Sequence, residues 1–339
     1  MNIIITLLIL GIIILIHELG HFLSAKYFKM PVSEFAIGMG PKLFSIQKEY
    51  TLYSIRAIPM GGFVNIDGMD IENPVENGFN NKKPLERFIV LFAGVFMNFI
   101  LALVIVFSLN FLSGGQYHVR EDAIIGSIIE NSPASTYLQK EDVILEINNK
   151  PINKWTDINI LTSTLDNPKV NMLINRNGEM IPLEFNLEYN EQRQTYLIGI
   201  QPHFDFVPYT FTEKISASLS DYKNLFTGVF KGLKMLFSGE VKSTDMAGPV
   251  GLVKIVGTFT SSGIGMILML VALLSVNIGI LNLMPFPALD GGRIIFVILE
   301  LFGIKVNKKI EEKIHYLGMF ILLILIVLIT LNDIKNLFR

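Results

Sequence analysis

Three ionisable side chains interrupt an apolar run near the start of the chain. Residues 3–25 read IIITLLILGIIILIHELGHFLSA, so that His17, Glu18 and His21 follow a stretch whose most polar member is one threonine. On a helix, His17 and His21 lie on one face, one turn apart. Imidazole is a common zinc ligand, and the H-E-x-x-H spacing pairs two such ligands with a carboxylate that can act as a base. These residues predict zinc-assisted hydrolysis, with Glu18 as the catalytic base.

The surroundings of these residues favour a metal site over a simple position of the histidines at the membrane interface. If the apolar run ended at Ile16, the two histidines would simply lie at a membrane interface. An unpaired ionisable group at membrane depth costs several kcal/mol, so its presence there points to function. The i, i+4 spacing of the two histidines around an acidic residue favours the metal site.

A catalytic zinc ion needs a third protein ligand and leaves its fourth position open to water. The other histidines of the chain are His118, His203 and His315. The first two belong to a long polar loop that the topology given below places on the far side of the membrane, and His315 begins the fourth apolar run alone. Asp290, in N-L-M-P-F-P-A-L-D-G-G-R after the third apolar run, is the better candidate.

Prolines and glycines around Asp290 explain how its carboxylate could reach the histidines. Pro285 and Pro287 end the preceding helix and free backbone groups, which are tolerated at membrane depth only inside protein or beside a wet cavity. Gly291 and Gly292 then allow a tight turn that aims the carboxylate. Asp290 therefore completes the predicted ligand set.

The composition of the chain excludes several classes of protein. Of its 339 residues, 51% are hydrophobic and 17% charged, with a mean hydropathy of +0.49, which is typical of a protein with several membrane spans. The net charge of −2 gives no sign of a nucleic-acid partner. Because the chain contains no cysteine, thiolate zinc sites, disulfides and cysteine nucleophiles are excluded.

Four long apolar stretches predict a polytopic α-helical membrane protein with about four transmembrane helices. They are Ile3–Ala25, Phe88–Leu112, Ile264–Met284 and His315–Leu331. Basic residues follow the first stretch and precede the second and the fourth, and short basic flanks stay in the cytoplasm. We therefore expect a multi-pass protein of the cell (inner or plasma) membrane, with both termini and the loop between the second and third spans on the extracytoplasmic side.

The loop after the second span has the composition of a soluble domain. Short β-type runs such as IIGSIIENSPAS and EDVILEINNKPI are broken by proline, asparagine and glycine. A strand leading to S-P-A, a short helix and then D-V-I-L-E-I-N resemble a PDZ domain, and a generic small α/β domain is the alternative. We divide the chain into residues 1–112 with the first two spans, 113–205 as the inserted αβ PDZ-like domain, 206–260 as an amphipathic helix and connecting loop, and 261–339 with the last two spans.

Two further segments flank the spans. Phe211–Phe237 has apolar residues at every third or fourth position, which predicts an amphipathic helix that lies in the membrane interface or caps the soluble domain. Glu49–Asn65, in the loop after the first span, reads as two strands joined through Pro59-Met60-Gly61-Gly62. Such a cytoplasmic-side β-hairpin has an open edge, to which an extended peptide could pair by strand addition.

Together these motifs resemble the site-2 protease family of intramembrane zinc metalloproteases, in its bacterial RseP/RasP-like, single-PDZ form. H-E-L-G-H in the first span, P-M-G-G-F-V in the following loop and N-L-M-P-F-P-A-L-D-G at the third span carry the likeness. It implies that zinc is bound by His17, His21 and Asp290. It also implies that Glu18 is the catalytic base and that Asn282 helps to hold the substrate. We further assign four residues of the matching motifs to substrate binding: Pro285, Pro287, Gly61 and Gly62.

One position departs from the pattern of the family. The second span of the family usually carries G-P-x-x-N, whereas this chain reads Gly94-Val95-Phe96-Met97-Asn98. Because the proline is missing, we do not expect a kink at this position. Asn98 and Asn277 are interpreted as residues that form hydrogen bonds between helices.

The predicted function is zinc-dependent cleavage, within the lipid bilayer, of single-span membrane proteins in regulated intramembrane proteolysis. The resemblance implies anti-sigma factors and remnant signal peptides as substrates. One alternative is a non-catalytic, membrane-tethered PDZ adaptor with a structural metal, although such a site is normally closed by four ligands. Another alternative is a transporter that uses the intramembrane ionisable residues, but four spans without an inverted repeat argue against it.

Overall fold

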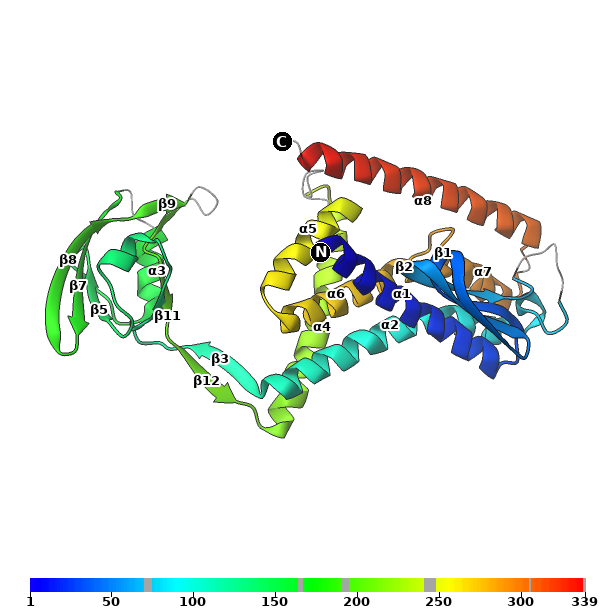
Figure 1. Ribbon diagram of the computed structural model, residues 1–339, viewed down its shortest axis with the longest axis horizontal. Helices are drawn as coiled ribbons and strands as arrows, with labels where there is room; N and C mark the ends of the chain where they lie inside the picture. Colours follow the sequence, from blue (N-terminus) through cyan, green and yellow to red (C-terminus); the bar gives the residue numbers. More distant parts are fainter. Residues whose placement is uncertain (70–74, 164–166, 191–194, 241–247, 305, 338–339) are drawn as a thin grey trace. The chain divides into compact units, whose positions relative to one another are not determined.

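The computed structural model describes residues 1–69, 75–163, 167–190, 195–240, 248–304 and 306–337 (Figure 1). Its internal contacts divide the chain into two compact units, Met1–Leu112 with Ile215–Arg339 and Ser113–Lys214. The first unit carries the long helices, and the second is an α/β domain inserted between them. Residues 241–247, in the expected connecting loop, lie outside the described residues.

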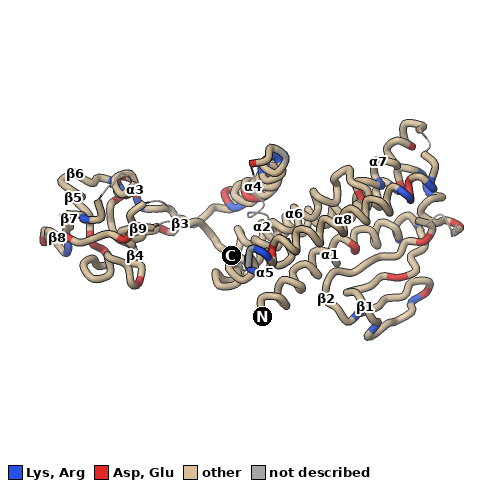
Figure 2. Tube along the Cα trace, turned by 90° about the horizontal axis from the view of Figure 1, so that it is seen from above, with Lys and Arg blue, Asp and Glu red and all other residues tan. Residues whose placement is uncertain are grey.

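Four helices of the first unit are long and apolar enough to cross a membrane, as predicted. Figure 2 shows long stretches of these helices that carry no Lys, Arg, Asp or Glu. The fourth helix begins before the predicted span, because the lysine-rich segment preceding His315 is helical as well. The four helices are α1 (Asn2–Tyr27), α2 (Pro84–Ser113), α6 (Ile264–Leu283) and α8 (Lys308–Leu337).

A small residue lets α1 and α2 approach backbone to backbone. A Cβ atom on Gly20 of α1 would lie 2.3 Å from the carbonyl oxygen of Ala93 in α2, closer than a real Cβ can come. At the same end of the two helices, Ala25 and Val90 are buried together with Ile294 of helix α7 (Asp290–Leu301). The end of α1 that carries the two histidines, and the end of α2 that Gly20 contacts, are therefore fixed against α7.

The segment between α1 and α2 forms a β-hairpin, as predicted, but its strands extend beyond Glu49–Asn65. Two long strands pair antiparallel and turn at Glu49 and Tyr50. They are β1 (Val32–Lys48) and β2 (Thr51–Ile66). The 3-10 turn η1 (Phe79–Asn81) precedes α2.

The pairing within the hairpin differs from the prediction for Glu49–Asn65. Phe35 has Cα partners at both Tyr53 and Val64, so that residues 34–37 of β1 lie between the two halves of β2. The prediction that this segment forms two strands paired with each other is therefore wrong. The partner of both halves is supplied by β1, which the pattern of the segment alone does not reveal.

The hairpin lies beside α1 (Figure 1). A Cβ atom on Gly11 of α1 would lie 2.7 Å from the carbonyl oxygen of Pro59, and Gly61 of β2 faces the side chain of Ile14. Further along, the backbone of Val64 bonds to Glu18. β2 thus runs alongside α1 for about 10 Å of the helix axis. Residues 59–64 of β2 therefore lie next to the part of α1 that carries the predicted metal ligands.

The chain breaks between α6 and α7, and Asp290 is the first residue of α7. The sequence analysis predicted a tight turn at Gly291 and Gly292. In the structure, these two glycines instead belong to the first helical turn of α7. A Cβ atom on these glycines would lie 2.3 Å and 2.4 Å from the carbonyl oxygens of Met284 and Phe286. The glycines therefore let α7 pack directly on the broken backbone.

The amphipathic helix α4 (Phe211–Phe237) packs on the apolar helices of the first unit. Val229 is buried in one cluster with Ala102 of α2. The hydroxyl of Tyr222 donates a hydrogen bond to the carbonyl of Phe99 at 3.1 Å. The face of α4 that carries Tyr222 and Val229 therefore packs against α2.

The second unit is built around a single apolar cluster that includes Ile144, Trp155 and Met172. Its largest sheet has the order β6-β5-β7-β8, and three pairs complete it: β4 with β11, β9 with β10, and β3 with β12. Because β12 pairs with β3, the unit extends past residue 205 to Lys214. The elements are β3 (Gly115–Val119), β4 (Ile125–Ile128), η2 (Pro133–Thr136), β5 (Val143–Ile147), β6 (Lys150–Pro151), α3 (Trp155–Ser163), β7 (Lys169–Arg176), β8 (Glu179–Asn186), β9 (Glu188–Asn190), β10 (Thr195–Leu197), β11 (Ile200–Pro202) and β12 (Phe204–Pro208).

One carboxylate connects the end of α8 to the start of α5 (Pro249–Ser261). Asp333 of α8 is buried and accepts backbone N–H groups of Gly248, Val250 and Gly251 at 3.0, 3.1 and 2.8 Å. Those N–H groups have no acceptor within α5, because the first turn of a helix lacks preceding carbonyls. Asp333 is therefore the cap of α5, supplied from another helix.

We expect Asp333→Ala to lower the free energy of unfolding by about 1–3 kcal/mol, because three backbone donors at the start of α5 lose their acceptor. Thermal unfolding of the purified chain in detergent measures the effect. Lys335→Ala, an exposed position on the same turn of α8, is the control and should leave the midpoint unchanged. Equal midpoints for the two variants would contradict the assigned role of Asp333.

Candidate metal centre

Two imidazoles and a carboxylate meet where α1 and the start of α7 pack together. His17 Nε2 and His21 Nε2 lie 3.0 Å and 3.4 Å from Asp290 Oδ2, and the two Nε2 atoms are 3.1 Å apart. Both histidines are buried, each with 6% of its surface exposed. The structure thus brings together the three side chains that the sequence analysis chose as metal ligands.

The geometry of these atoms suits a tetrahedral zinc ion. Zinc–nitrogen distances of about 2.0–2.1 Å and tetrahedral angles place neighbouring ligand atoms about 3.3 Å apart, and the three observed separations are 3.0, 3.1 and 3.4 Å. Apart from these two imidazoles, the buried Asp290 Oδ2 has no hydrogen-bond partner among the described residues. A shared cation would satisfy this oxygen. Two nitrogens and one oxygen are the donors of a catalytic zinc site, in which a fourth position stays open.

Hydrogen bonds behind the imidazoles set which nitrogen faces the centre. His21 Nδ1 donates to the carbonyl of Val90 at 2.8 Å, which leaves the lone pair on Nε2 for a metal. His17 Nδ1 lies 3.4 Å from the side-chain amide of Asn98, and the backbone carbonyl of Asn98 accepts the hydroxyl of Ser275 at 2.9 Å. The backbone of Asn98 is therefore joined to α6, and its side chain contacts a candidate ligand on α1, a contact that the sequence analysis missed.

Gly94 is a second site residue that the sequence analysis did not identify. A Cβ atom at this position would lie 2.4 Å from His21 Nε2 and 2.8 Å from His17 Cε1. Only a glycine therefore lets α2 cover the two imidazoles. The available signal was the i, i+4 spacing of Gly94 and Asn98, which puts both on one face of the second span.

Glu18 lies beside the centre and is held by the hairpin. Its Oε2 accepts the backbone N–H of Val64 in β2 at 3.0 Å. Together with the three candidate ligands it lines a cavity of about 200 Å³, which has room for water and for a peptide group. Met69 and Arg293 line the same cavity. Arg293 is one turn after Asp290 on α7, a spacing that could have drawn attention to it.

The predicted substrate-binding residues fall into two groups. Asn282, on the last turn of α6, has its amide nitrogen 3.5 Å from His17 Nε2 and so belongs to the surroundings of the centre. Pro285 and Pro287 lie in the break before α7. Gly61 and Gly62 contact neighbouring elements instead: a Cβ atom would meet Ile14 of α1 at 3.2 Å in the first case and the carbonyl of Ala36 in β1 at 2.5 Å in the second.

The other three histidines have partners of their own. His118 and His203 are in the second unit, where His118 contacts Gln116 and His203 lies 3.8 Å from Asp205. His315 of α8 accepts the backbone N–H of Ala288 through its Nδ1, at 3.0 Å. The preference for Asp290 over these histidines agrees with the arrangement in the structure.

Known proteins resemble the chain over nearly its full length. Residues 5–325 match the family model described as Peptidase family M50. A proposed zinc metalloprotease of Fusobacterium nucleatum is 46% identical over 340 residues, which cover 100% of both chains. A second one, of Clostridium acetobutylicum, is 35% identical and aligns with 98% of this chain and 97% of its own length.

Solved structures also match part of the chain. The PDZ domain of the SdrC-like protein of Listeria innocua aligns with 24% of this chain and 94% of that domain, at 19% identity and a TM-score of 0.23. At this TM-score the PDZ-like character of residues 113–205 stays a prediction.

We expect Gly94→Ala to reduce zinc affinity at least tenfold, because the added methyl group occupies the space of the His21 imidazole and the centre cannot close. Competition with a fluorescent zinc chelator on the detergent-purified chain measures the affinity. Gly265→Ala on α6 is the matched control, since its nearest neighbour would lie 4.0 Å away. Similar zinc affinities for the two variants would contradict the close cover by α2.

Proposed function

This chain belongs to peptidase family M50, the site-2 protease family of zinc metalloproteases, and we propose that it hydrolyses peptide bonds of membrane proteins within the bilayer. The observation that supports this proposal best is the meeting of His17, His21 and Asp290 within 4.8 Å. The two histidines belong to α1, which has the length and composition of a membrane span. We assign these three side chains as the zinc ligands and Glu18 as the base.

The proposed chemistry divides between zinc and the residues around it. Bound zinc supplies Lewis acidity, which polarises a scissile carbonyl and makes water more acidic. Glu18, which lines the cavity beside the ligands, takes a proton from the attacking water as the new carbon–oxygen bond forms. The same carboxylate then passes the proton to the leaving nitrogen as the carbon–nitrogen bond breaks. The products are a carboxylate and an amine.

The hairpin has two roles in this proposal. The bond from the Val64 N–H to Glu18 Oε2 orients the base toward the cavity. A helical substrate must also unwind before its carbonyls can react, because these carbonyls are engaged in i→i+4 hydrogen bonds. Residues 62–66 of β2 pair with β1 on one side only. An unwound substrate strand could therefore add to this edge of the sheet, beside Glu18.

The substrate class follows from the position of the site. An active centre between apolar helices selects segments that enter the bilayer, so we propose single-span membrane proteins, among them anti-sigma factors and remnant signal peptides, as substrates. We further propose a multi-pass protein of the cell membrane whose termini and second unit are extracytoplasmic, since basic residues flank the opposite ends of the spans. A PDZ-like second unit would then select substrates at their outer end, either by excluding large domains or by binding the new terminus.

Replacing Glu18 distinguishes two hypotheses: a zinc protease, and a non-catalytic protein whose metal is only structural. We expect Glu18→Gln to retain zinc and to lose cleavage by a factor of about 10²–10⁴, because the amide cannot accept the proton of water. The assay is single-turnover cleavage, in proteoliposomes, of tagged single-span segments shortened on one side. Asp290→Ala should lose both zinc and cleavage. Unchanged cleavage by Glu18→Gln would remove Glu18 from the mechanism.

Asn282 can be tested separately, because its amide could serve the substrate or the broken end of α6. If it donates to the substrate backbone or to the developing oxyanion, Asn282→Ala lowers kcat about 10²-fold while zinc affinity and the unfolding midpoint stay near their native values. We expect this outcome from its 3.5 Å separation from His17. A lowered midpoint with native kcat would show that Asn282 supports only the helix end.

A further inference from the structure

The backbone just before Asp290 is held in an unfavourable conformation. Ala288 has a φ of +81°, in the left-handed region that costs residues with a Cβ atom. Asparagine, lysine and glutamate occupy the other positive-φ positions that the structure describes outside glycine, and their polar side chains can bond locally. Ala288 has no such side chain. Its conformation must therefore be stabilised by other parts of the chain.

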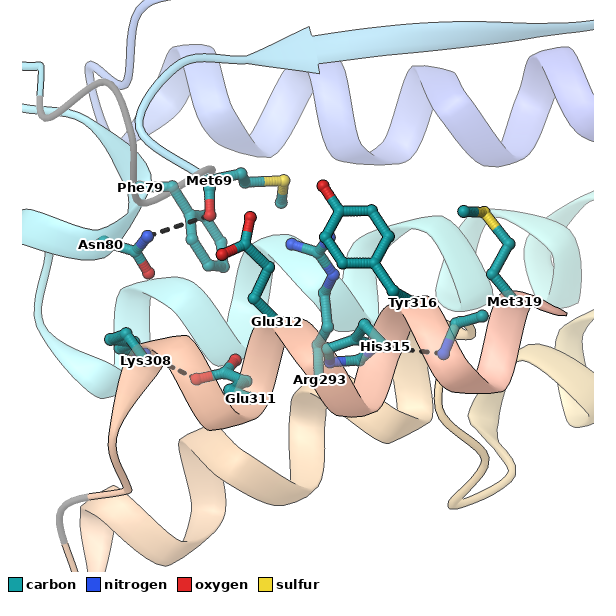
Figure 3. Close-up of a pocket in the computed structure, with 11 residues that line it drawn as sticks. Met69, Phe79, Asn80, Arg293, Lys308, Glu311, Glu312, His315, Tyr316 and Met319 are labelled. Carbon is teal, nitrogen blue, oxygen red and sulfur yellow. Dashed lines mark hydrogen bonds and ion pairs between the residues drawn. The ribbon is translucent and has the colours of Figure 1, made fainter. Parts of the chain in front are cut away.

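The stabilising contacts come from α8. His315 Nδ1 accepts the backbone N–H of Ala288 at 3.0 Å (Figure 3, dashed line). One turn later, Gly318 faces Pro287, and a Cβ atom on this glycine would lie only 2.4 Å from the Cβ of the proline. Residues three apart share a face of a helix. One face of α8 therefore contacts the strained turn with His315, which accepts its N–H group, and with Gly318, which has no side chain. The ring of His315 also packs edge-on against Phe296 of α7, 5.8 Å between ring centres.

These contacts stand out because α8 is otherwise little buried. In the most apolar stretch of α8, 6% of the residues are buried inside the protein, whereas 39% are buried in the corresponding stretches of α2 and α6. The other anchor of α8 is Asp333, near its far end. General packing of α8 therefore does not explain why a polar side chain and a glycine meet the turn before Asp290.

We propose that His315 is a positioning residue for the metal ligand Asp290. By accepting the Ala288 N–H, its imidazole holds the turn in the left-handed conformation, and this turn sets where α7 begins and where the Asp290 carboxylate points. His315 does not touch the metal in this arrangement. The inference rests on the proposed function in so far as Asp290 is taken as a zinc ligand.

His315 also lines a pocket of about 200 Å³ between α7, α8 and the segment that follows β2 (Figure 3). Arg293 and Met69 line both this pocket and the cavity of the metal centre. A substitution of His315 could therefore change activity by altering the pocket. For this reason the test measures zinc affinity and uses a second position, on the turn itself.

The experiment compares zinc affinity, by chelator competition on the full detergent-purified chain, for two variants of His315. His315→Phe keeps an aromatic ring against Phe296 but removes the acceptor, and we expect a loss of about tenfold or more. His315→Asn places an amide oxygen near the position of Nδ1 and should stay within about threefold of the native affinity. Leu323→Ala, at an exposed position of α8, is the control and should match the native chain. If His315→Phe does not fold, His315→Leu replaces it.

The decisive variant is Ala288→Gly combined with His315→Phe. Glycine adopts a positive φ without steric cost, so the double variant should recover roughly fivefold or more of the lost affinity. Native affinity in His315→Phe would overturn the proposal. An equal loss in His315→Asn, or the absence of recovery in the double variant, would also overturn it. These outcomes are distinct from failure of the proposed function, in which Asp290→Ala itself would leave zinc affinity unchanged.

Discussion

The structure depends on one constraint: ionisable groups in apolar surroundings need partners. His17, Glu18 and His21 lie on a helix whose other residues suit a membrane, and Asp290 begins a second helix packed against it. Separated, each charged form would be strongly disfavoured by desolvation. Brought within 4.8 Å, two imidazoles and a carboxylate can share a divalent cation that compensates all three. The packing of α1, α2 and α7 follows from this need for contact.

A second constraint concerns the backbone. Peptide groups that leave a helix at membrane depth must find partners inside the protein. The break between α6 and α7 meets this requirement through α8, which accepts the Ala288 N–H and packs on Pro287. The backbone of both halves of β2 pairs with β1. The backbone N–H of Val64 donates to the carboxylate of Glu18. The irregular segments thus lie beside the centre, while its ligands are carried by the helices α1 and α7.

The sequence alone predicted the parts that local pattern determines. Apolar length identified the four long helices, and the i, i+4 spacing identified His17 and His21 because a helix fixes which residues share a face. The hairpin was predicted, but its pairing was wrong, because residues 34–37 insert between two segments that follow them in the sequence. Contacts between distant elements were missed for the same reason: Gly94 over the imidazoles, Asn98 beside His17 and His315 beside Ala288.

X-ray absorption at the zinc edge of the purified chain tests the central claim most directly. We expect a first shell of nitrogen and oxygen at about 2.0–2.2 Å, with the outer scattering of two imidazoles and one carboxylate. The purified Asp290→Ala chain should have lost its zinc and should not give this spectrum. A shell with three or more imidazoles, or a spectrum that Asp290→Ala does not change, would contradict the convergence of α1 and α7 on one metal ion.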